Sequence, residues 1–413
     1  MKPQNFEERL IWYTLISTYL LYITGLLFPV NTTICWVLLV RLLRKIWLQK
    51  NYPSSEQLHI PWTIWVLIIS MMVMLFSTIV GLVDFNYDAR EIIRSMLNWT
   101  RDWSLLALFP LIGCCLNIRP KLIYRAACII CLQSLIIMPI CCLAYVLKFP
   151  PLLYSSPLER ITQNGKIYYN IILYIRDYDS GGLRLSLFTP WAPALGLISC
   201  IFLIFALNES NAKWRLIGLL GSIAMLILSV SRGALVFLPL VILAVWMLTR
   251  LSNYYLQIAA GFTCFVGGLF SAQFLDALKA FFDEFSGARK SSSEVRAALE
   301  RLALERWLEA PIWGHGKPIK GPPLLKGMPI GSHHTWFGLL FTQGAIGFSA
   351  FLIPSVTTVI ALIIKLQKDQ TARVGLSVWL LILFASMSDN IEKLAYIYWS
   401  ALLVVGIALR ADS

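Results

Sequence analysis

Two adjacent histidines, His333 and His334, lie where a polar loop meets a long apolar run. Ser332 or Thr335 can cap a helix that begins here, which places both imidazoles in its first turn. The positive end of a helix disfavours a protonated imidazole, so a histidine at this point tends to stay neutral near pH 7. Because a neutral imidazole can accept a proton, the pair contains a candidate general base. The alternative is an interfacial histidine that only caps the helix and contacts lipid headgroups.

Arginines near the ends of apolar runs form a second group of candidates. Arg232 lies where two long apolar runs meet, and Arg184 shortly precedes another. A charge among membrane spans is costly and usually faces the protein interior or a ligand. Arginine binds phosphate through paired, charge-assisted hydrogen bonds, so both side chains could hold an anion. The alternative is a tight turn that carries Arg232 to a lipid phosphate.

Three more arginines lie on a predicted amphipathic helix. Apolar residues recur there at helical spacing, which predicts a helix lying along the membrane surface; they are Val295, Ala298, Leu299, Leu302 and Ala303. Arg296 and Arg301 each have a glutamate four residues later, so part of this charge could be ordinary pairing on a solvated face. Arg306 projects back onto the apolar stripe, where a cation needs a partner.

Acidic residues and cysteines give little support for a metal or a cofactor. Asp177 and Asp179 have the D-x-D spelling of many metal-binding transferases, but such pairs are common in loops. The Cys128-x-x-Cys131 pattern lies in an apolar run, where small packing residues explain it better than zinc or redox chemistry. Two adjacent histidines without a third ligand make a poor zinc site. Asp389 or Glu392 could orient an imidazole or an arginine, or the two acids could pair with Lys393.

These residues must be positioned by membrane-spanning helices. Of the 413 residues, 58% are hydrophobic and 14% are charged, whereas a soluble protein carries roughly 25% charged residues. The apolar residues form runs of about 20, the length that crosses a bilayer core. This composition points to a membrane protein rather than to a nucleic-acid-binding one. We expect about twelve spans, at residues 10–30, 32–48, 62–83, 102–118, 123–147, 187–207, 213–229, 233–249, 254–272, 336–364, 374–388 and 393–409.

Lysine and arginine in the short loops predict the orientation of these spans, with both termini in the cytoplasm. Two long loops, 148–186 and 273–335, then lie outside, and we treat residues 1–413 as one membrane domain with an external cap. The formal net charge is +13. Part of it lies in the larger outer loop, so an anionic partner such as a phosphate or a lipopolysaccharide headgroup is expected there. The alternative is a basic surface that adheres to anionic lipid.

Together these motifs resemble the O-antigen ligase and polymerase superfamily of membrane glycosyltransferases. The likeness covers about residues 180–350 in spaced motifs. The family's Ser-His-Asn-aromatic signature resembles the stretch 332–336, with Gly344 following; His334 stands at the asparagine position, and His333 is favoured as the base. The family's Ser-Arg-Gly turn resembles 231–233. The family's arginine upstream of an Ala-Leu-Glu…Pro…Gly-x-Gly stretch corresponds to Arg296, with Arg301 and Arg306 as rival assignments. A second arginine of the family corresponds to Arg184.

The resemblance implies an all-α GT-C-type transferase of twelve spans in the bacterial inner membrane, with a periplasmic helical cap between spans nine and ten. The donor would be a glycan on undecaprenyl pyrophosphate and the acceptor a sugar hydroxyl of lipid A–core, with inversion and without metal, nucleotide or cofactor. His333 would be the base, and Arg184, Arg232 and Arg296 would hold the pyrophosphate. Further candidates are His334, Arg301, Arg306 and Asp389.

Three other activities remain open from the sequence. An O-antigen polymerase or a protein O-oligosaccharyltransferase would use the same chemistry, and a lipid-linked-sugar flippase or transporter is a different class. Transporters often carry charged residues along a path through the middle of the membrane. The candidates here are predicted to cluster on one side of the membrane, which favours an enzyme. Surplus lysines in the outer loop suit a polyanionic acceptor and so favour a ligase; they are Lys317, Lys320 and Lys326.

Overall fold

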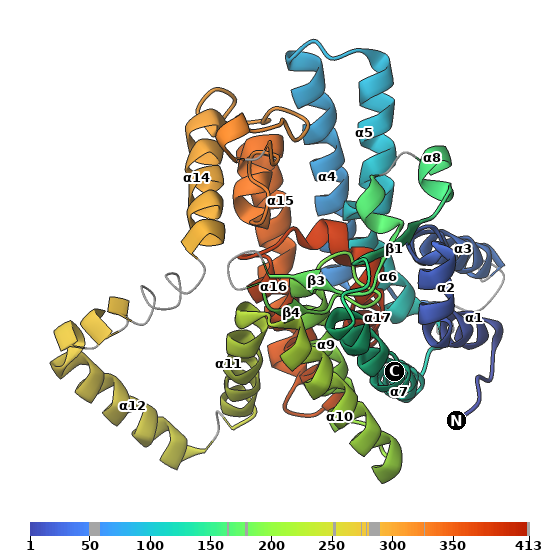
Figure 1. Ribbon diagram of the computed structural model, residues 1–413. Coiled ribbons are helices and arrows are strands. Elements are labelled where there is room, and N and C mark those ends of the chain that lie inside the picture. Colours follow the sequence, from blue (N-terminus) through green and yellow to red (C-terminus); the bar gives the residue numbers. More distant parts are fainter. Residues whose placement is uncertain are drawn as a thin grey trace.

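The computed structural model describes residues 1–48, 58–162, 165–177, 181–250, 253–273, 275–277, 279–280, 290–325 and 327–410. These form a helical bundle with a few short strands (Figure 1). The helices are α1 (Phe6–Ile16), α2 (Thr18–Thr24), α3 (Leu27–Leu48), α4 (Trp62–Asp84), α5 (Ala89–Arg101), α6 (Trp103–Cys115), α7 (Pro120–Val146), α8 (Leu158–Thr162), α9 (Ala192–Leu207), α10 (Ala212–Ser229), α11 (Arg232–Leu248), α12 (Tyr254–Leu269), α14 (Lys290–Trp307), α15 (Thr335–Lys365), α16 (Gln370–Ala385) and α17 (Ile391–Leu409). Short 3₁₀ helices lie at Lys166–Tyr168 and Pro323–Leu325.

The helices agree with the expectation of an all-α membrane protein. Six of those described are long and apolar enough to cross a bilayer, namely α3, α4, α7, α10, α15 and α17. Three apolar helices, α9, α11 and α16, are shorter. The fragments Gln257–Leu269 and Ser271–Ala277 would make one more span if taken together, although they meet at 84°.

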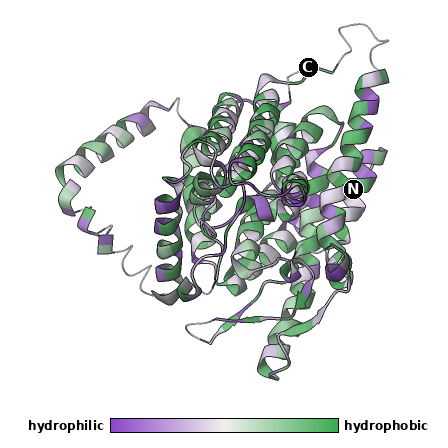
Figure 2. Cartoon of the chain, turned by 90° about the horizontal axis from the view of Figure 1, so that it is seen from above, coloured by the Kyte–Doolittle hydropathy of each residue, from purple (hydrophilic) through white to green (hydrophobic). Residues whose placement is uncertain are grey.

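Helix α17 forms the centre of the bundle. Every one of its residues except Lys393 is buried, as expected of a helix that is apolar on all sides. Glycines let α6 approach it closely: a Cβ on Gly113 would lie 2.2 Å from the Leu403 carbonyl oxygen, and one on Gly406 would lie 2.1 Å from that of Pro110. Small residues serve the same purpose in many membrane helix pairs. Seen from above, apolar residues cover most of the surrounding helices (Figure 2).

Two cysteines that could have suggested redox chemistry are packing residues. A Cβ on Gly218 would lie 2.6 Å from Cys128 Sγ, and one on Gly221 would lie 2.7 Å from Cys131 Cβ. The two glycines belong to α10 and the two cysteines to α7, so these residues form the contact between the helices. Both thiols are free and buried. The packing interpretation of this pattern is confirmed.

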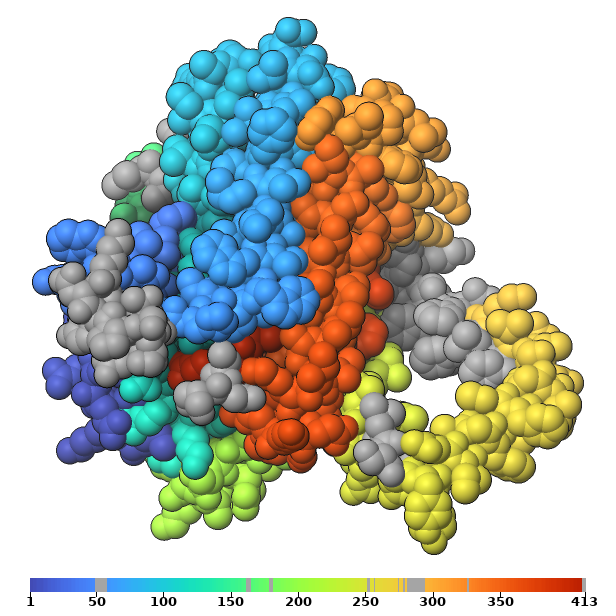
Figure 3. All heavy atoms as spheres, turned by 180° about the vertical axis from the view of Figure 1, so that it is seen from behind, coloured from blue at the N-terminus to red at the C-terminus, as the bar shows by residue number. Residues whose placement is uncertain are grey.

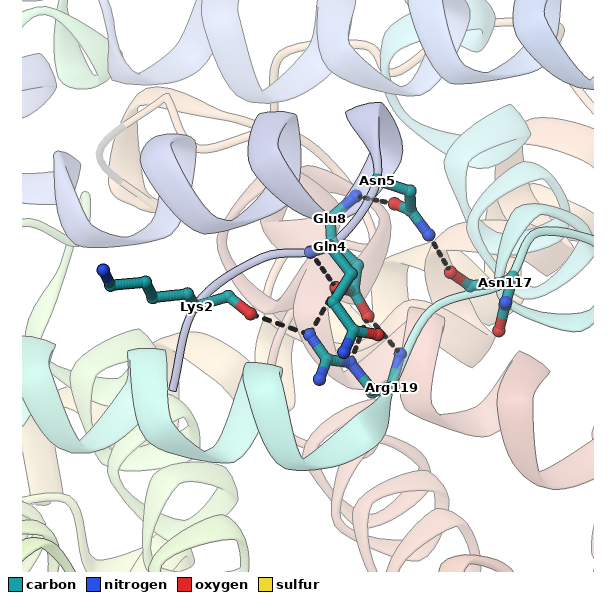
Figure 4. A network of polar contacts seen from close by, with 6 residues as sticks. All are labelled: Lys2, Gln4, Asn5, Glu8, Asn117 and Arg119. Atoms are coloured by element: carbon teal, nitrogen blue, oxygen red, sulfur yellow. Dashed lines mark hydrogen bonds and ion pairs between the residues drawn. The ribbon is translucent and has the colours of Figure 1, made fainter.

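Several basic residues that the charge pattern assigns to the cytoplasm hold helix ends together. Arg119 donates from Nε and Nη2 to the two carboxylate oxygens of Glu8 at 2.7 and 2.6 Å (Figure 4). Arg125 makes a similar two-pronged pair with Glu209, and the Glu209 side chain is only 1% exposed. Arg410 donates to carbonyls at the end of α6. At least part of the large positive charge is therefore structural.

The boundaries near the N-terminus differ from the expected ones. The first turn lies at Gly25, which ends α2 with a left-handed φ of 74°, so α3 begins at Leu27 rather than near residue 32. The expected span 102–118 is α6, and the helix before it, α5, was not predicted because its charged residues lower its hydropathy. The chain breaks between α5 and α6 at Asp102, whose φ and ψ of −109° and −86° are not helical.

Residues 148–186, the smaller of the two predicted outer loops, contain secondary structure that the sequence pattern did not predict. Strands β1 (Leu152–Ser155) and β2 (Asn170–Ile172) pair antiparallel, as do β3 (Ile175–Arg176) and β4 (Leu183–Arg184). In the second pair, Arg184 lies opposite Ile175. This short ribbon therefore fixes the backbone of one candidate arginine.

Helix α15 is not the continuous span that its apolar run predicts. Gly344 has φ 62° and ψ −162°, which interrupts the helix, and the loop 311–316 fits into the break. His315 N and Gly316 N donate to the Phe341 and Thr342 carbonyls before the break, while Ala345 N and Ile346 N after it donate to Pro311 O and Ile312 O. The loop thus satisfies backbone groups that would otherwise be unpaired within an apolar bundle.

Glycine is required on both sides of this contact. A Cβ on Gly344 would lie 2.2 Å from the Ile312 carbonyl oxygen, and one on Gly314 would lie 2.4 Å from the Gln343 nitrogen. Helix α4 packs along the same face of α15, and the two lie side by side in the view from behind (Figure 3). Ser77 of α4 donates to the Gln343 carbonyl at 2.8 Å. Hence α4, α15 and the loop form one unit.

The amphipathic helix predicted for the segment 273–335 exists as α14, but its apolar stripe faces the rest of the protein. Leu299 and Ala303 are fully buried, and Ala303 packs with Ile330 and Phe341. The stripe therefore packs against α15 and the loop before it, which corrects the expectation of a surface-lying helix. In contrast, α12 stands away from the bundle in Figure 1, and its described side chains are exposed or half-buried.

Candidate active site

His333 has an unusual backbone conformation just before α15. Its φ is 68°, in the left-handed region that residues other than glycine rarely adopt. The backbone N–H of His333 donates to Asn390 Oδ1 at 2.7 Å, across the turn between α16 and α17. Thr335 strengthens the same junction, because its hydroxyl donates to the Asp389 carbonyl at 2.7 Å and its N–H donates to the Ser386 carbonyl at 2.9 Å. The turn 386–390 therefore holds the start of α15.

Both histidines favour the neutral form. Burial lowers the pKa of His333 to about 4, and the positive charge of Arg296 acts in the same direction. Burial alone lowers the pKa of His334 to about 4. His334 is the N-terminal cap residue of α15, its ring lies against Phe337, and its Nδ1 has no hydrogen-bond partner among the described residues. Both imidazoles would thus be unprotonated at neutral pH, as a proton acceptor must be.

Asp389 lies buried beside this junction. Trp191 Nε1 donates to Asp389 Oδ2 at 2.6 Å, and the Asn390 N–H donates to Asp389 Oδ1 at 2.9 Å. Burial raises the pKa of Asp389 to about 6, although both hydrogen bonds and the charge of Arg296 act against this rise. The carboxyl group can therefore change its charge close to physiological pH.

Arg296 brings α14 to the same turn. Its Nη1 donates to the Ser388 carbonyl at 3.4 Å, and its charge acts on both His333 and Asp389. Three of the candidate residues, from segments far apart in the chain, are consequently gathered at one end of the bundle. The sequence placed Arg296 in a loop helix without showing what it would face.

Arg232 begins α11 at the edge of a small cavity. Ser231, the cap residue before it, lines a cavity of about 30 Å³ together with Ser388 and Asp389. A Cβ on Gly233, the next residue, would lie 3.8 Å from Ser388 Oγ. The backbone around Arg232 thus adjoins the turn that holds Asp389, and the cavity has room for about one water molecule.

Arg184 lies against the residues that precede Arg232. Its Nε donates to the Ser229 carbonyl at 3.3 Å, at the end of α10. Its Nη1 pairs with Asp177 Oδ1 at 3.4 Å, with both side chains largely buried (14% and 10% exposed). Asp177 therefore faces an arginine, and Asp179, the second acid of the D-x-D pattern, lies outside the described residues. Arg184 thus lies beside the segment that precedes Arg232, whereas Arg296, His333 and Asp389 gather at the turn 386–390.

The rival arginines do not lie in this group. Arg301 and Arg306 are exposed on α14, and Arg306 pairs with exposed Glu309 at 3.0 Å. The partner of Arg306 is thus an exposed glutamate in the turn after α14, and Arg306 does not lie on the buried stripe. Among the arginines of α14, the geometry favours Arg296 as the site residue.

Sequence reasoning missed several residues that build the site. Asn390 and Trp191 contact His333 and Asp389 from positions 57 and 198 residues away in the chain. The sequence offered one signal for Asn390, its position next to the candidate Asp389. Nothing in the sequence distinguishes Trp191 from the other tryptophans.

A comparison with known families identifies the segment that carries much of this arrangement. Residues 217–352 match the O-antigen ligase family. This O-antigen ligase segment covers about a third of the chain, which is similar to the family over that range. This is a family of glycosyltransferase-like membrane enzymes, and a comparison with individually curated proteins returned no match. The O-antigen ligase segment includes Arg232, Arg296 and His333, whereas Arg184 and Asp389 lie outside it.

Within the O-antigen ligase segment, the structure gives physical roles to the family-like glycines. Gly314, Gly316 and Gly344 have φ values of 68°, 77° and 62°. They form the contact between the loop 311–316 and the break in α15. The loop thus holds the half-helix that begins next to His333.

Proposed function

We propose that this protein is an O-antigen ligase, which transfers a glycan from undecaprenyl pyrophosphate to a sugar hydroxyl of lipid A–core. The observation that carries the proposal is the grouping of neutral His333 with Arg296 and the Asp389 turn, inside and beside the segment that matches the family. The reaction would take place at the periplasmic side of the bacterial inner membrane. No metal or cofactor takes part in the proposed reaction.

The proposed chemistry uses one proton acceptor and three cations. His333 accepts the proton of the acceptor hydroxyl as its oxygen attacks the anomeric carbon, and the bond to pyrophosphate breaks with inversion. Arg184, Arg232 and Arg296 bind the pyrophosphate and stabilise the negative charge that grows on it as it leaves. Both substrates are lipids, so a site at the end of a membrane bundle suits them.

The proposed topology has twelve spans in a GT-C-type arrangement. It counts α1 with α2 as one span and α5 with α6 as another, together with the six long helices, the three shorter apolar helices and α12. Both termini are then cytoplasmic, and the two long loops form the periplasmic side, with α14 as the cap. Reporter fusions near residues 165 and 290 should read as periplasmic, and one near residue 370 as cytoplasmic.

The acceptor distinguishes a ligase from a polymerase, and three lysines were expected to bind a polyanionic one. Lys317 pairs with Glu91 at 2.9 Å and lies over the Tyr87 ring, so its charge is already partly neutralised. Lys320 is exposed, and Lys326 lies outside the described residues. Among the three lysines, Lys320 is therefore the one we assign to a polyanionic acceptor.

The decisive experiment supplies purified protein with a preassembled undecaprenyl-linked glycan, with and without lipid A–core. Glycan-capped lipopolysaccharide should form only when the core is present, and the lipid-linked chain should not lengthen. If the donor chain grows and the core stays bare, the protein is a polymerase. If neither product forms but the donor crosses the bilayer of a vesicle, the protein is a transporter.

A further inference from the structure

His333 needs a structural reason to keep its left-handed backbone. A residue with a Cβ pays about 1–2 kcal/mol for this conformation, so it persists only where its surroundings determine it. The hydrogen bond from His333 N to Asn390 Oδ1, at 2.7 Å, is short and crosses from one helix end to another. This hydrogen bond fixes the backbone of His333, and that backbone determines the direction of the imidazole.

The orientation of the Asn390 amide follows from its two partners. A backbone N–H can only donate, so the atom facing His333 must be the amide oxygen. The amide nitrogen then faces Glu392 and donates to its Oε1 at 3.3 Å. Glu392 is buried (8% exposed), and its Oε2 has no hydrogen-bond partner among the described residues. The reverse orientation would place the amide nitrogen against the His333 N–H and the amide oxygen against a buried carboxylate oxygen, which would be costly.

Glu392 is itself held in place. It lies in the first turn of α17, the most deeply buried helix of the bundle, and the next residue, Lys393, pairs with Asp102 at the junction of α5 and α6. The backbone N–H of Ile391 also donates to Thr335 Oγ1 at 3.1 Å. The bridge from Glu392 through Asn390 to His333 therefore begins on a rigid support.

We infer that Asn390, oriented by Glu392, is a positioning residue for the proposed base His333. The inference rests on the proposed function for the role of His333, but the bridge itself concerns the geometry of this chain. Asn390 touches the His333 backbone rather than a substrate. Its loss should consequently impair the chemical step and leave binding of the lipid-linked donor unchanged.

Three variants test the bridge. Asn390→Ala removes both hydrogen bonds, and Glu392→Ala removes the acceptor that orients the amide. Glu392→Gln is the matched control, because its side-chain oxygen can still accept from the Asn390 amide. We expect kcat to fall about 10–100-fold in both alanine variants, as displacement of a reacting group by about 1 Å does, with KM for the donor unchanged within about twofold. Glu392→Gln should stay within about threefold of the wild type.

A double variant separates positioning from a general structural effect. In the His333→Ala background, Asn390→Ala should lower the residual transfer by less than about twofold, because residues that act through one another are not additive. A full additional loss would overturn the inference. So would a rise in KM that accounts for the whole defect of Asn390→Ala. If Asn390→Ala does not fold, the comparison of Glu392→Ala with Glu392→Gln decides in the same way.

A measurement without substrate keeps this inference separate from the proposed function. Diethyl pyrocarbonate modifies neutral imidazole, and mass spectrometry reads the rate at His333 and at His334 separately. The His333 rate should rise several-fold in Asn390→Ala and Glu392→Ala and should match the wild type in Glu392→Gln, with His334 as the internal reference. Equal His333 rates in all four proteins would overturn the bridge. A wild type that lacks transferase activity would instead contradict the proposed function.

Discussion

The guanidinium of Arg296 donates to the backbone carbonyl of Ser388 at 3.4 Å, which joins α14 to the turn between α16 and α17. This contact spans 92 residues of sequence and places a permanent positive charge beside His333 and Asp389. It also distinguishes Arg296 from the two other arginines that follow it on the same helix. If the proposed reaction is correct, this charge faces the leaving pyrophosphate.

Replacing Arg296 should therefore be far more harmful than replacing its neighbours. We expect Arg296→Ala to lower transfer about 100-fold, since loss of one donor to a developing anion costs that order of rate. Arg301→Ala and Arg306→Ala, on the exposed face of α14, serve as matched controls and should stay within about twofold. The measurement is the initial rate of transfer by purified protein in detergent. An effect of Arg301→Ala as large as that of Arg296→Ala would contradict the assignment.

The two histidines should differ in the same assay. His333→Ala should lower transfer by about 10²–10⁴-fold, the usual cost of removing a general base, while the protein keeps its melting temperature. His334→Ala should be milder, because that ring lies against Phe337 and its residue serves as a helix cap. Loss of activity from the His334 change alone would show that the base is His334.

The pH dependence of transfer should report the titration of Asp389 rather than that of a histidine. His333, with a pKa of about 4, stays neutral between pH 5 and pH 7, so it causes no acid limb in that range. Asp389, with a pKa of about 6, takes up a proton as the pH falls through that value, which removes its negative charge beside Arg296. We expect kcat/KM, which reports the free enzyme, to decrease below about pH 6. The profile of Asp389→Asn should lose the limb near pH 6, and a limb that persists there would assign the titration to another group.

The contact in the break of α15 makes a prediction about stability. Gly344→Ala should destabilise the fold by at least about 3 kcal/mol, because its backbone region is almost restricted to glycine and the new Cβ would meet the Ile312 carbonyl oxygen at 2.2 Å. Gly181→Ala is the control: φ there is 67°, but no atom lies within 4 Å of the new Cβ. That change should cost only about 1 kcal/mol. Thermal unfolding in detergent compares the two, and equal melting temperatures would show that the contact does not stabilise the bundle.

Local patterns in the sequence were enough to predict the class of fold and most of the helices. Apolar runs of membrane length predict helices such as α4, α7 and α10 within a few residues, because in a bilayer the backbone must satisfy its own hydrogen bonds. Charge in an apolar setting singled out Arg184 and Arg232, and two histidines at a helix start singled out His333. These signals are local, and each needs only a few neighbouring residues.

Contacts between distant segments decided the rest. The break at Gly344 was not predictable, because the surrounding run has the length and hydropathy of one continuous span and only the loop 311–316 supplies the missing hydrogen bonds. The choice of Arg296 over Arg301 and Arg306 depends on which face of α14 meets the turn 386–390. Similarly, the bridge from Asn390 to His333 depends on how α15 packs beside α17. Composition and periodicity describe one helix at a time, so they do not contain the packing that brings these groups within hydrogen-bond distance.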